Sequence, residues 1–214
     1  MKMLLVFEME GFLFYQKGPS QIKGKRTIES SVIIREDEFK WGAKLYKSRP
    51  NALKFLDLCL SKFDVGILSS KYGMKDGTAL FRKFLSDRKV ELEPQLLFLW
   101  FLERCTKDKR GKTHINMDKV WEEFTMKSSE SNTTMFVLEG DNVQVHPSDN
   151  CILEKPYNTS SDEEESDMIR GIWKVLSKIQ LTTELDRKTF ILSLNSIHRE
   201  FNIIKCIKPM NILN

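Results

Sequence analysis

The sequence lacks a long apolar run, and this absence excludes several classes of protein. The longest apolar run of interest, residues 96–102, is much shorter than the roughly 20 residues that a helix needs to cross a bilayer. The apolar start of the chain is interrupted by Glu8 and Glu10, so it resembles neither a signal peptide nor an arginine-rich transit peptide. We therefore expect a nuclear or cytoplasmic protein without a transmembrane segment.

Cysteine and histidine are also scarce. The four cysteines contain no C-x-x-C pair, and the three histidines lie far apart. This spacing argues against a zinc site and a disulfide framework, and it predicts reduced cysteines, with Cys59 and Cys105 in the core. The net charge is only +4, and the short basic stretches at residues 23–26 and 107–112 favour solvated loops over a nucleic-acid site.

Short apolar runs alternate with helical patterns along most of the chain. The predicted strands span residues 3–7, 63–68, 96–102, 134–138 and 151–153. One predicted helix begins near Pro50 and buries Leu53, Leu56, Leu58 and Leu60. The other predicted helices span residues 73–85, 118–124, 168–179 and 184–201.

Buried strands that alternate with helices predict the fold class. Strands without polar alternation are typical of a mainly parallel sheet that is covered on both faces. We therefore predict a Rossmann-like α/β domain over residues 1–180, with helices on both faces of the sheet. Turn signals and β-branched residues predict a small β-hairpin insertion at about residues 18–47, and residues 181–214 form a predicted helical extension.

Polar side chains follow the three clearest predicted strands. They are Glu8 and Glu10, Ser69 and Ser70, and Glu139 and Asp141. Because parallel sheets bind ligands at the carboxyl ends of their strands, we expect these side chains to surround one cleft. Four neighbouring carboxylates repel one another, so a cation or raised pKa values are expected. Magnesium or calcium held by the four acids, without turnover, is one open alternative.

Five motifs in this order resemble a known family. They are Glu8 to Phe12 (EMEGF), Arg49-Pro50, Val65 to Ser70 (VGILSS), Leu138 to Asn142 (LEGDN) and His146 to Tyr157 (HPSDNCILEKPY). Together they resemble the small C-terminal-domain phosphatases and the nuclear-LIM-interactor-interacting-factor-like proteins of the haloacid dehalogenase superfamily. The resemblance runs from about residue 3 to residue 179 and implies a haloacid-dehalogenase-like fold.

The resemblance also implies roles for individual residues. In that family the first acid of the loop attacks phosphorus, the second acts as acid and base, and magnesium neutralises the phosphate. These roles fall on Glu8 and Glu10, and the hydroxyl donor falls on Ser69. Ser69, Ser70 and Lys112 would bind phosphate. Lys112 is the nearest candidate for the family's lysine, although it lies upstream of the expected position.

Several residues depart from the family pattern. Glutamates replace the aspartates, and misplacing a reacting group by about 1 Å can cost on the order of a hundredfold in rate. Phe12 adds bulk beside the loop, and Gly140 removes the central acid between Glu139 and Asp141. Losses of transition-state stabilisation at several positions together should leave little turnover.

We therefore expect a catalytically impaired phosphatase-like protein that acts by binding a protein or a phosphopeptide. One alternative is a magnesium-dependent serine/threonine phosphatase that forms an acyl phosphate on Glu8. A further alternative is a relative of the mitochondrial presequence receptors, a branch that needs a membrane anchor and a targeting segment. We detect neither segment in the sequence.

Overall fold

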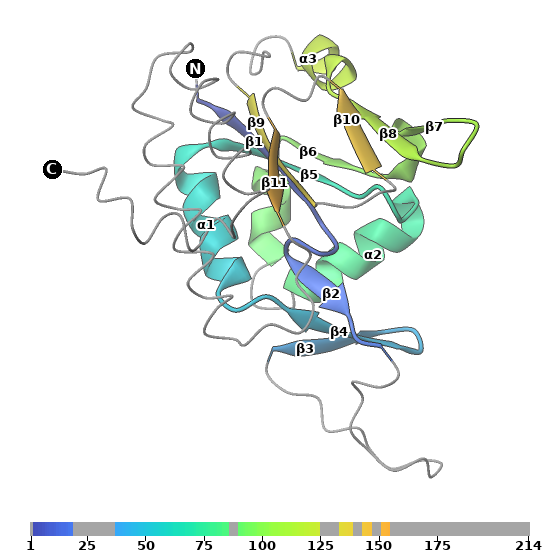
Figure 1. The fold of residues 1–214 in the computed structure, drawn as a ribbon. Helices are drawn as coiled ribbons and strands as arrows, with labels where there is room; N and C mark the ends of the chain where they lie inside the picture. Colours follow the sequence, from blue (N-terminus) through green and yellow to red (C-terminus); the bar gives the residue numbers. More distant parts are fainter. Residues whose placement is uncertain are drawn as a thin grey trace, which may run out of the picture.

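The computed structural model describes residues 2–18, 37–85, 90–124, 133–138, 143–146 and 151–154. Its central feature is a five-stranded sheet (Figure 1). From one edge to the other its strands are β11 (Cys151–Glu154), β9 (Thr133–Leu138), β1 (Leu4–Glu8), β5 (Asp64–Leu68) and β6 (Phe98–Trp100). Every pairing between neighbours in this sheet is parallel. The predicted mainly parallel α/β sheet is therefore confirmed.

The strand order reverses at β1. The chain moves outward from β1 through β5 to β6, and then returns to place β9 and β11 on the opposite side of β1. Glu8 lies opposite Leu68 of β5, and Phe7 lies opposite Phe136 of β9. The carboxyl ends of these strands thus meet at a topological switch point, where Rossmann-like sheets bind their ligands.

Two helices cover one face of the sheet. They are α1 (Ala52–Lys62) and α2 (Met74–Leu85). Phe55 of α1 and Leu80 of α2 share a core cluster with Leu5 and Phe7 of β1. Because alternate residues of a strand point to opposite faces, Leu4 and the other even-numbered residues of β1 need a second layer.

That second layer consists of a helix and a small sheet. The sheet contains β10 (Val143–His146), β8 (Thr113–Asn116) and β7 (Thr106–Lys107), and the helix is α3 (Asp118–Glu123). Ile115 and Val120 from this layer pack in one cluster with Leu4 and Val6. Every residue of β1 is buried, so the expected covering of both faces is confirmed.

The predicted insertion after the first strand is a three-stranded antiparallel sheet. It contains β2 (Phe14–Gln16), β4 (Lys44–Ser48) and β3 (Glu38–Trp41), in that order. In Figure 1 it lies at the end of the molecule toward which β1 points. Residues 19–36, where part of the insertion was expected, lie outside the described residues.

Two details of the sequence prediction are wrong. Leu58 is 39% exposed, because the buried side of α1 follows a helical period that includes Phe55 and Cys59 but leaves Leu58 on the other side. The predicted strand at residues 96–102 is too long, because β6 gives way to the 3-10 helix Leu102–Arg104. There the Leu102 N–H donates to the Tyr72 carbonyl oxygen at 3.0 Å instead of continuing the ladder.

Several expectations fall outside the described part of the chain. The predicted helices at residues 168–179 and 184–201, and with them the boundary at residue 180, are among these. A further short 3-10 helix, Val90–Gln95, connects α2 to β6. No helix within the described residues is long and apolar enough to span a membrane.

Candidate functional site

The chain turns sharply where β1 ends. Glu8 is the last residue of β1, and the Met9 N–H donates to the Leu68 carbonyl oxygen of β5 at 2.8 Å. Gly11 has a φ of 88°, a conformation that residues with a Cβ rarely adopt. The Leu13 N–H then closes the turn on the Met9 carbonyl oxygen at 3.1 Å. This turn holds Glu8 and Glu10 at the carboxyl end of the central strand.

A buried arginine fixes the outer side of this turn. Arg49 is 1% exposed, and its Nη2 donates to the Gly11 carbonyl oxygen at 3.1 Å. Its guanidinium also lies 5.2 Å from the centre of the Phe12 ring, and its backbone N–H donates to the Leu13 carbonyl oxygen at 2.9 Å. The Arg-Pro motif of the sequence therefore acts on the acidic loop itself.

The bulk of Phe12 lies in the core. Its side chain is fully buried and stacks on Phe7, with ring centroids 5.0 Å apart. Phe55 of α1 packs against both rings. Phe12 therefore anchors the loop to the helix-covered face of the sheet, and its bulk is accommodated in the core beside Phe7 and Phe55.

The two serines after β5 have different contacts. The Ser70 hydroxyl donates a short hydrogen bond to Oε1 of Glu8. Ser69 Oγ instead accepts the backbone N–H groups of Lys71 at 3.4 Å and Tyr72 at 3.1 Å, so Ser69 shapes the turn. Glu8 is 5% exposed and Ser70 is 8% exposed. The hydroxyl that contacts the acidic loop is thus that of Ser70.

A lysine that sequence reasoning did not single out lies in the site. Lys71 Nζ is 2.7 Å from Oε1 of Glu10, and the Lys71 side chain remains more than half exposed. The candidate chosen from the sequence, Lys112, lies on the β7–β8 hairpin, where its backbone N–H donates to Oδ1 of Asp108 at 2.9 Å. The sequence could have indicated Lys71, because it directly follows Ser69 and Ser70 at the end of a predicted strand.

Two tyrosines connect this site to the insertion. The hydroxyl of Tyr46, on β4, lies 3.1 Å from that of Tyr72. Burial raises the pKa of Tyr72, and the hydrogen bond to Tyr46 and the nearby Glu10 charge raise it further. Burial also raises the pKa of Tyr46. The insertion sheet is therefore linked by a polar contact to the loop that carries Lys71.

We predict that these tyrosines weaken the fold at alkaline pH. A group whose pKa is raised by folding stabilises the protein below its ordinary value, here 10.0, and this stability is lost as the pH rises above it. The loss should approach about 1.4 kcal/mol per pH unit for each tyrosine. Urea unfolding at a series of pH values above 10.0 measures this loss. The free energy of unfolding should fall less steeply with pH in Tyr72→Phe than in the unmodified protein. An unchanged slope would contradict the prediction.

The predicted metal ligands are only partly described. Glu139 and Asp141 lie outside the described residues. Within the described residues, no group of three or more His, Cys, Asp or Glu side chains could hold a metal ion. Carboxylates are suitable ligands for Mg²⁺, but Lys71 already neutralises Glu10. Of the two described acids, Glu8 accepts the Ser70 hydroxyl and Glu10 forms an ion pair with Lys71.

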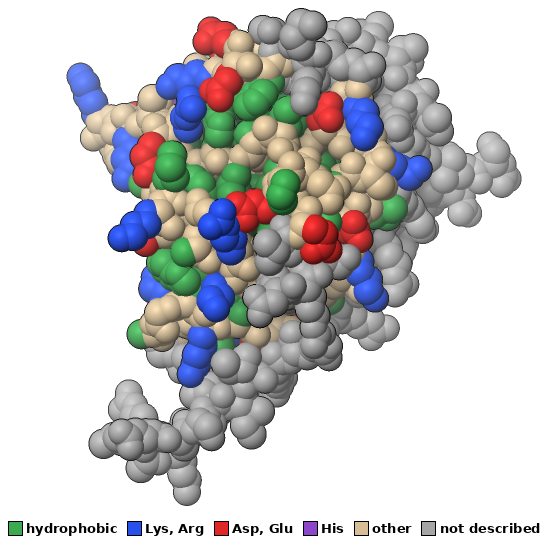
Figure 2. All heavy atoms as spheres, turned by 180° about the vertical axis from the view of Figure 1, so that it is seen from behind, with side chains coloured by type: hydrophobic (Ala, Val, Ile, Leu, Met, Phe, Trp, Pro, Cys, Tyr) green, Lys and Arg blue, Asp and Glu red, His purple; other side chains and the backbone are tan. Residues whose placement is uncertain are grey.

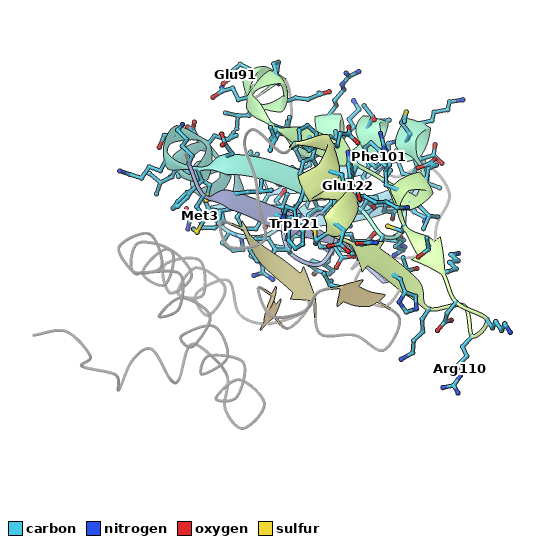
Figure 3. All side chains as sticks on the ribbon, turned by 90° about the horizontal axis from the view of Figure 1, so that it is seen from above. Met3, Glu91, Phe101, Arg110, Trp121 and Glu122 are labelled. Atoms are coloured by element: carbon cyan, nitrogen blue, oxygen red, sulfur yellow. The ribbon has the colours of Figure 1, made fainter. Side chains whose placement is uncertain are left out.

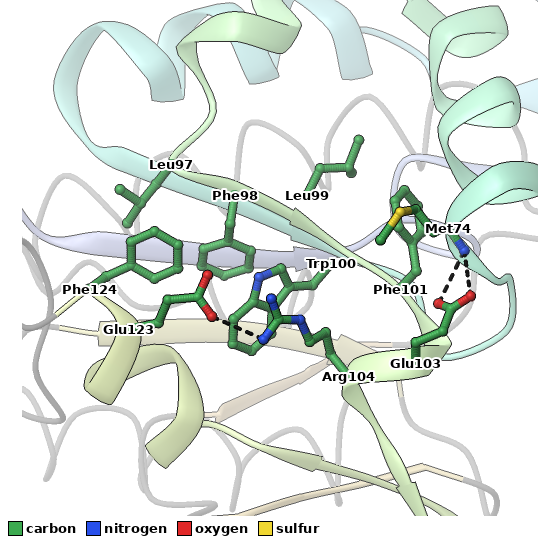
Figure 4. A pocket seen from close by; sticks show the side chains of 10 residues that line it. All are labelled: Met74, Leu97, Phe98, Leu99, Trp100, Phe101, Glu103, Arg104, Glu123 and Phe124. Carbon is green, nitrogen blue, oxygen red and sulfur yellow. Dashed lines mark hydrogen bonds and ion pairs between the residues drawn. The ribbon is translucent and has the colours of Figure 1, made fainter.

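A separate pocket of about 300 Å³ opens beside the edge strand β6 (Figure 4). Phe98 and Trp100 line it but remain largely buried, so both also belong to the core. Arg104 lies over the Trp100 ring at 4.8 Å and pairs with Glu123 at 3.0 Å. Among the described residues, the lining of this pocket includes neither Glu8 nor any other predicted site residue.

These contacts define an α/β protein of Rossmann-like topology with acids, a hydroxyl and a lysine at its switch point. No protein-family model matches the sequence, and no curated protein matches it. Two solved structures are similar to the chain. One is the fission yeast RNA polymerase II CTD phosphatase Fcp1, an Arg-to-Ala variant bound to beryllium fluoride, with 11% identity, a TM-score of 0.48 and 93% of this chain covered.

The second similar structure is Fcp1 described as an essential RNA polymerase II CTD phosphatase, with 10% identity, a TM-score of 0.48 and 93% of this chain covered. This chain covers 64% and 63% of the two Fcp1 chains, less than two thirds of either. The fold assignment rests on the strand order and register of this chain itself.

Proposed function

We propose that the chain is a haloacid-dehalogenase-like, phosphatase-like protein that binds its ligand without efficient turnover. The observation that supports this most directly is that both acids of the loop already bind other side chains of the same protein. Glu8 accepts the Ser70 hydroxyl, and Glu10 pairs with Lys71. The proposed ligand is a protein partner or a phosphopeptide.

The engagement of the acids acts against phosphoryl transfer. A nucleophile must approach phosphorus in line, and Glu8 is 5% exposed beneath its turn. Oε1 of Glu10, the carboxylate in the acid/base position, is already bound by Lys71 Nζ at 2.7 Å. Turnover would require both carboxylates to leave these partners, in addition to the extra length of the glutamates.

The same groups suit the binding of an anion. Lys71 offers an exposed ammonium group at the carboxyl ends of parallel strands, and Ser70, which precedes it in the chain, offers a hydroxyl after the same strand. A phosphate on a peptide could replace Glu10 as the partner of Lys71, because phosphate carries more charge than a single carboxylate. This exchange gives binding a direct chemical basis that needs no nucleophile.

Turnover of an aryl phosphate with magnesium tests the catalytic half of the proposal. We expect no turnover above that of Glu8→Gln, which serves as the matched background. Activity in the unmodified protein that Glu8→Gln abolishes would overturn the proposal and favour the acyl-phosphate alternative. Replacing residues 8, 10, 139 and 140 by aspartate then tests whether restored acids are sufficient for activity.

Binding of a fluorescent phosphoserine peptide, followed by anisotropy, tests the other half. Lys71→Gln should weaken it about tenfold, since a charge-assisted contact contributes roughly 1.5 kcal/mol. Lys62→Gln is the matched control, because Lys62 ends α1 just before β5 begins, at the opposite end of that strand from Lys71. Equal loss in both variants, or none, would contradict phosphopeptide binding at this site and leave a partner protein as the proposed ligand.

A further inference from the structure

The β7–β8 hairpin is an ordered projection from the second layer. Thr106 and Lys107 pair with His114 and Thr113 in an antiparallel ladder. The turn closes through the Asp108 N–H, which donates to the Lys112 carbonyl oxygen at 3.0 Å. Gly111 has a φ of 79°, so the turn uses the conformational freedom of glycine. The side chains of this hairpin therefore have a defined backbone beneath them.

Asp108, the acidic residue of the hairpin, accepts hydrogen bonds within the turn. Oδ1 of Asp108 accepts the backbone N–H groups of Arg110 at 2.8 Å and Lys112 at 2.9 Å. Oδ2 lies 3.4 Å from Nε2 of His114. These backbone hydrogen bonds lower the pKa of Asp108. The carboxylate thus supports the shape of the turn instead of pairing with a lysine or arginine side chain.

The cations of the hairpin are available to solvent. Lys107, Lys109 and Arg110 are exposed, and Figure 3 shows Arg110 at the far end of the projection. Within the described residues none of these three pairs with an acidic side chain. By contrast, Lys17 and Arg82 pair with glutamates elsewhere on the molecule. On the face seen in Figure 2, basic and acidic side chains are intermixed.

The base of the hairpin lies beside the strand-end site. The Leu102 N–H donates to the Tyr72 carbonyl oxygen at 3.0 Å, and the Cys105 N–H donates to the Leu102 carbonyl oxygen at 3.0 Å. Burial raises the pKa of Cys105 to about 11, and the Glu8 charge contributes to this shift. The base of the hairpin is therefore joined through Leu102 to Tyr72, in the loop that also carries Lys71.

We propose that the β7–β8 hairpin docks an acidic segment of a partner protein, rich in aspartate and glutamate. The argument is charge complementarity, since the exposed cations project together and pair with no acid in the part of the chain that the structure describes. Nucleic acid fits less well, because residues 105–116 contain no Phe, Tyr or Trp on which bases could stack. The inference goes beyond the proposed function and does not depend on it.

A labelled peptide of alternating glutamate and serine tests the proposal by fluorescence anisotropy. Replacing Lys107, Lys109 and Arg110 together by glutamine should weaken binding about tenfold, and added salt should reduce the difference. The control is Lys40→Gln with Lys44→Gln, which neutralises two exposed lysines on the β3–β4 hairpin. This control should bind like the unmodified protein.

Other outcomes would overturn the proposal. These are no binding by the unmodified protein, equal loss in the control, or an oligothymidine that binds as tightly with the same dependence on the hairpin. The chain has its own acidic run at residues 162–165. A variant in which this run is neutralised is tested for binding of the same peptide. Unchanged peptide affinity supports a partner segment, whereas stronger affinity would identify this run as the competing occupant.

Discussion

Replacing Gly66 by alanine is expected to destabilise the protein severely. Gly66 lies in the middle of β5 and opposite Phe98 of β6. A Cβ at this position would lie 2.2 Å from Cζ of the Phe98 ring, and two further ring carbons would lie within 2.6 Å. The ring is itself confined, because it packs against Trp100 and Phe124. We expect a loss of about 3 kcal/mol in the free energy of unfolding.

Urea unfolding of a double-mutant cycle checks this expectation. Phe98→Leu alone should cost about 1 kcal/mol, and adding it to Gly66→Ala should recover part of the loss because the obstructing ring is gone. The result that contradicts the prediction is a Gly66→Ala protein as stable as the unmodified one. Strictly additive losses would show that the ring is not the obstacle.

Replacing Arg49 by methionine is expected to have the second large effect. Methionine fills part of the buried space but cannot donate to the Gly11 carbonyl oxygen or place a cation over the Phe12 ring. An unsatisfied buried carbonyl and a lost charged hydrogen bond together cost about 3 kcal/mol. The turn that carries Glu10 should also become less well fixed.

Chemical unfolding and hydrogen exchange measure the two consequences of Arg49→Met. The Leu13 amide, which donates to the Met9 carbonyl oxygen within the turn, should exchange faster than in the unmodified protein. Arg49→Lys keeps a positive charge without the planar guanidinium. Its free energy of unfolding should lie between those of the unmodified protein and Arg49→Met. Arg82→Met, at an exposed ion pair, is the control and should change stability little. If Arg49→Met changed neither the free energy of unfolding nor the exchange of the Leu13 amide, the role assigned to this arginine would be contradicted.

Much of the central sheet could be predicted because its strands are buried on both faces. Leu4 to Phe7 and Val65 to Leu68 are continuous apolar runs, and both proved to be central strands. The run at residues 96–102 was equally apolar, yet only Phe98–Trp100 is a strand. Composition identifies burial, but the end of the strand is set by a contact of Leu102 with Tyr72 that is distant in sequence.

The candidate site was less accessible to sequence reasoning. The position of Glu8 and Glu10 followed from the end of a strand, whereas the contacts of Ser70 and Lys71 depend on the register of β5 against β1. A one-residue change of register would send alternate side chains to the other face of the sheet. Family spacing therefore pointed to Lys112, while the register brings Lys71 to Glu10.

The central position of β1 has a consequence for the order of folding. Its two partners, Asp64–Leu68 and Thr133–Phe136, come much later in the chain than Leu4–Glu8. During synthesis the strand that ends in Glu8 must therefore wait, apolar on both faces, until the segment that pairs with its second edge has left the ribosome. Sheets built from such distant pairings fold slowly and expose aggregation-prone surface meanwhile.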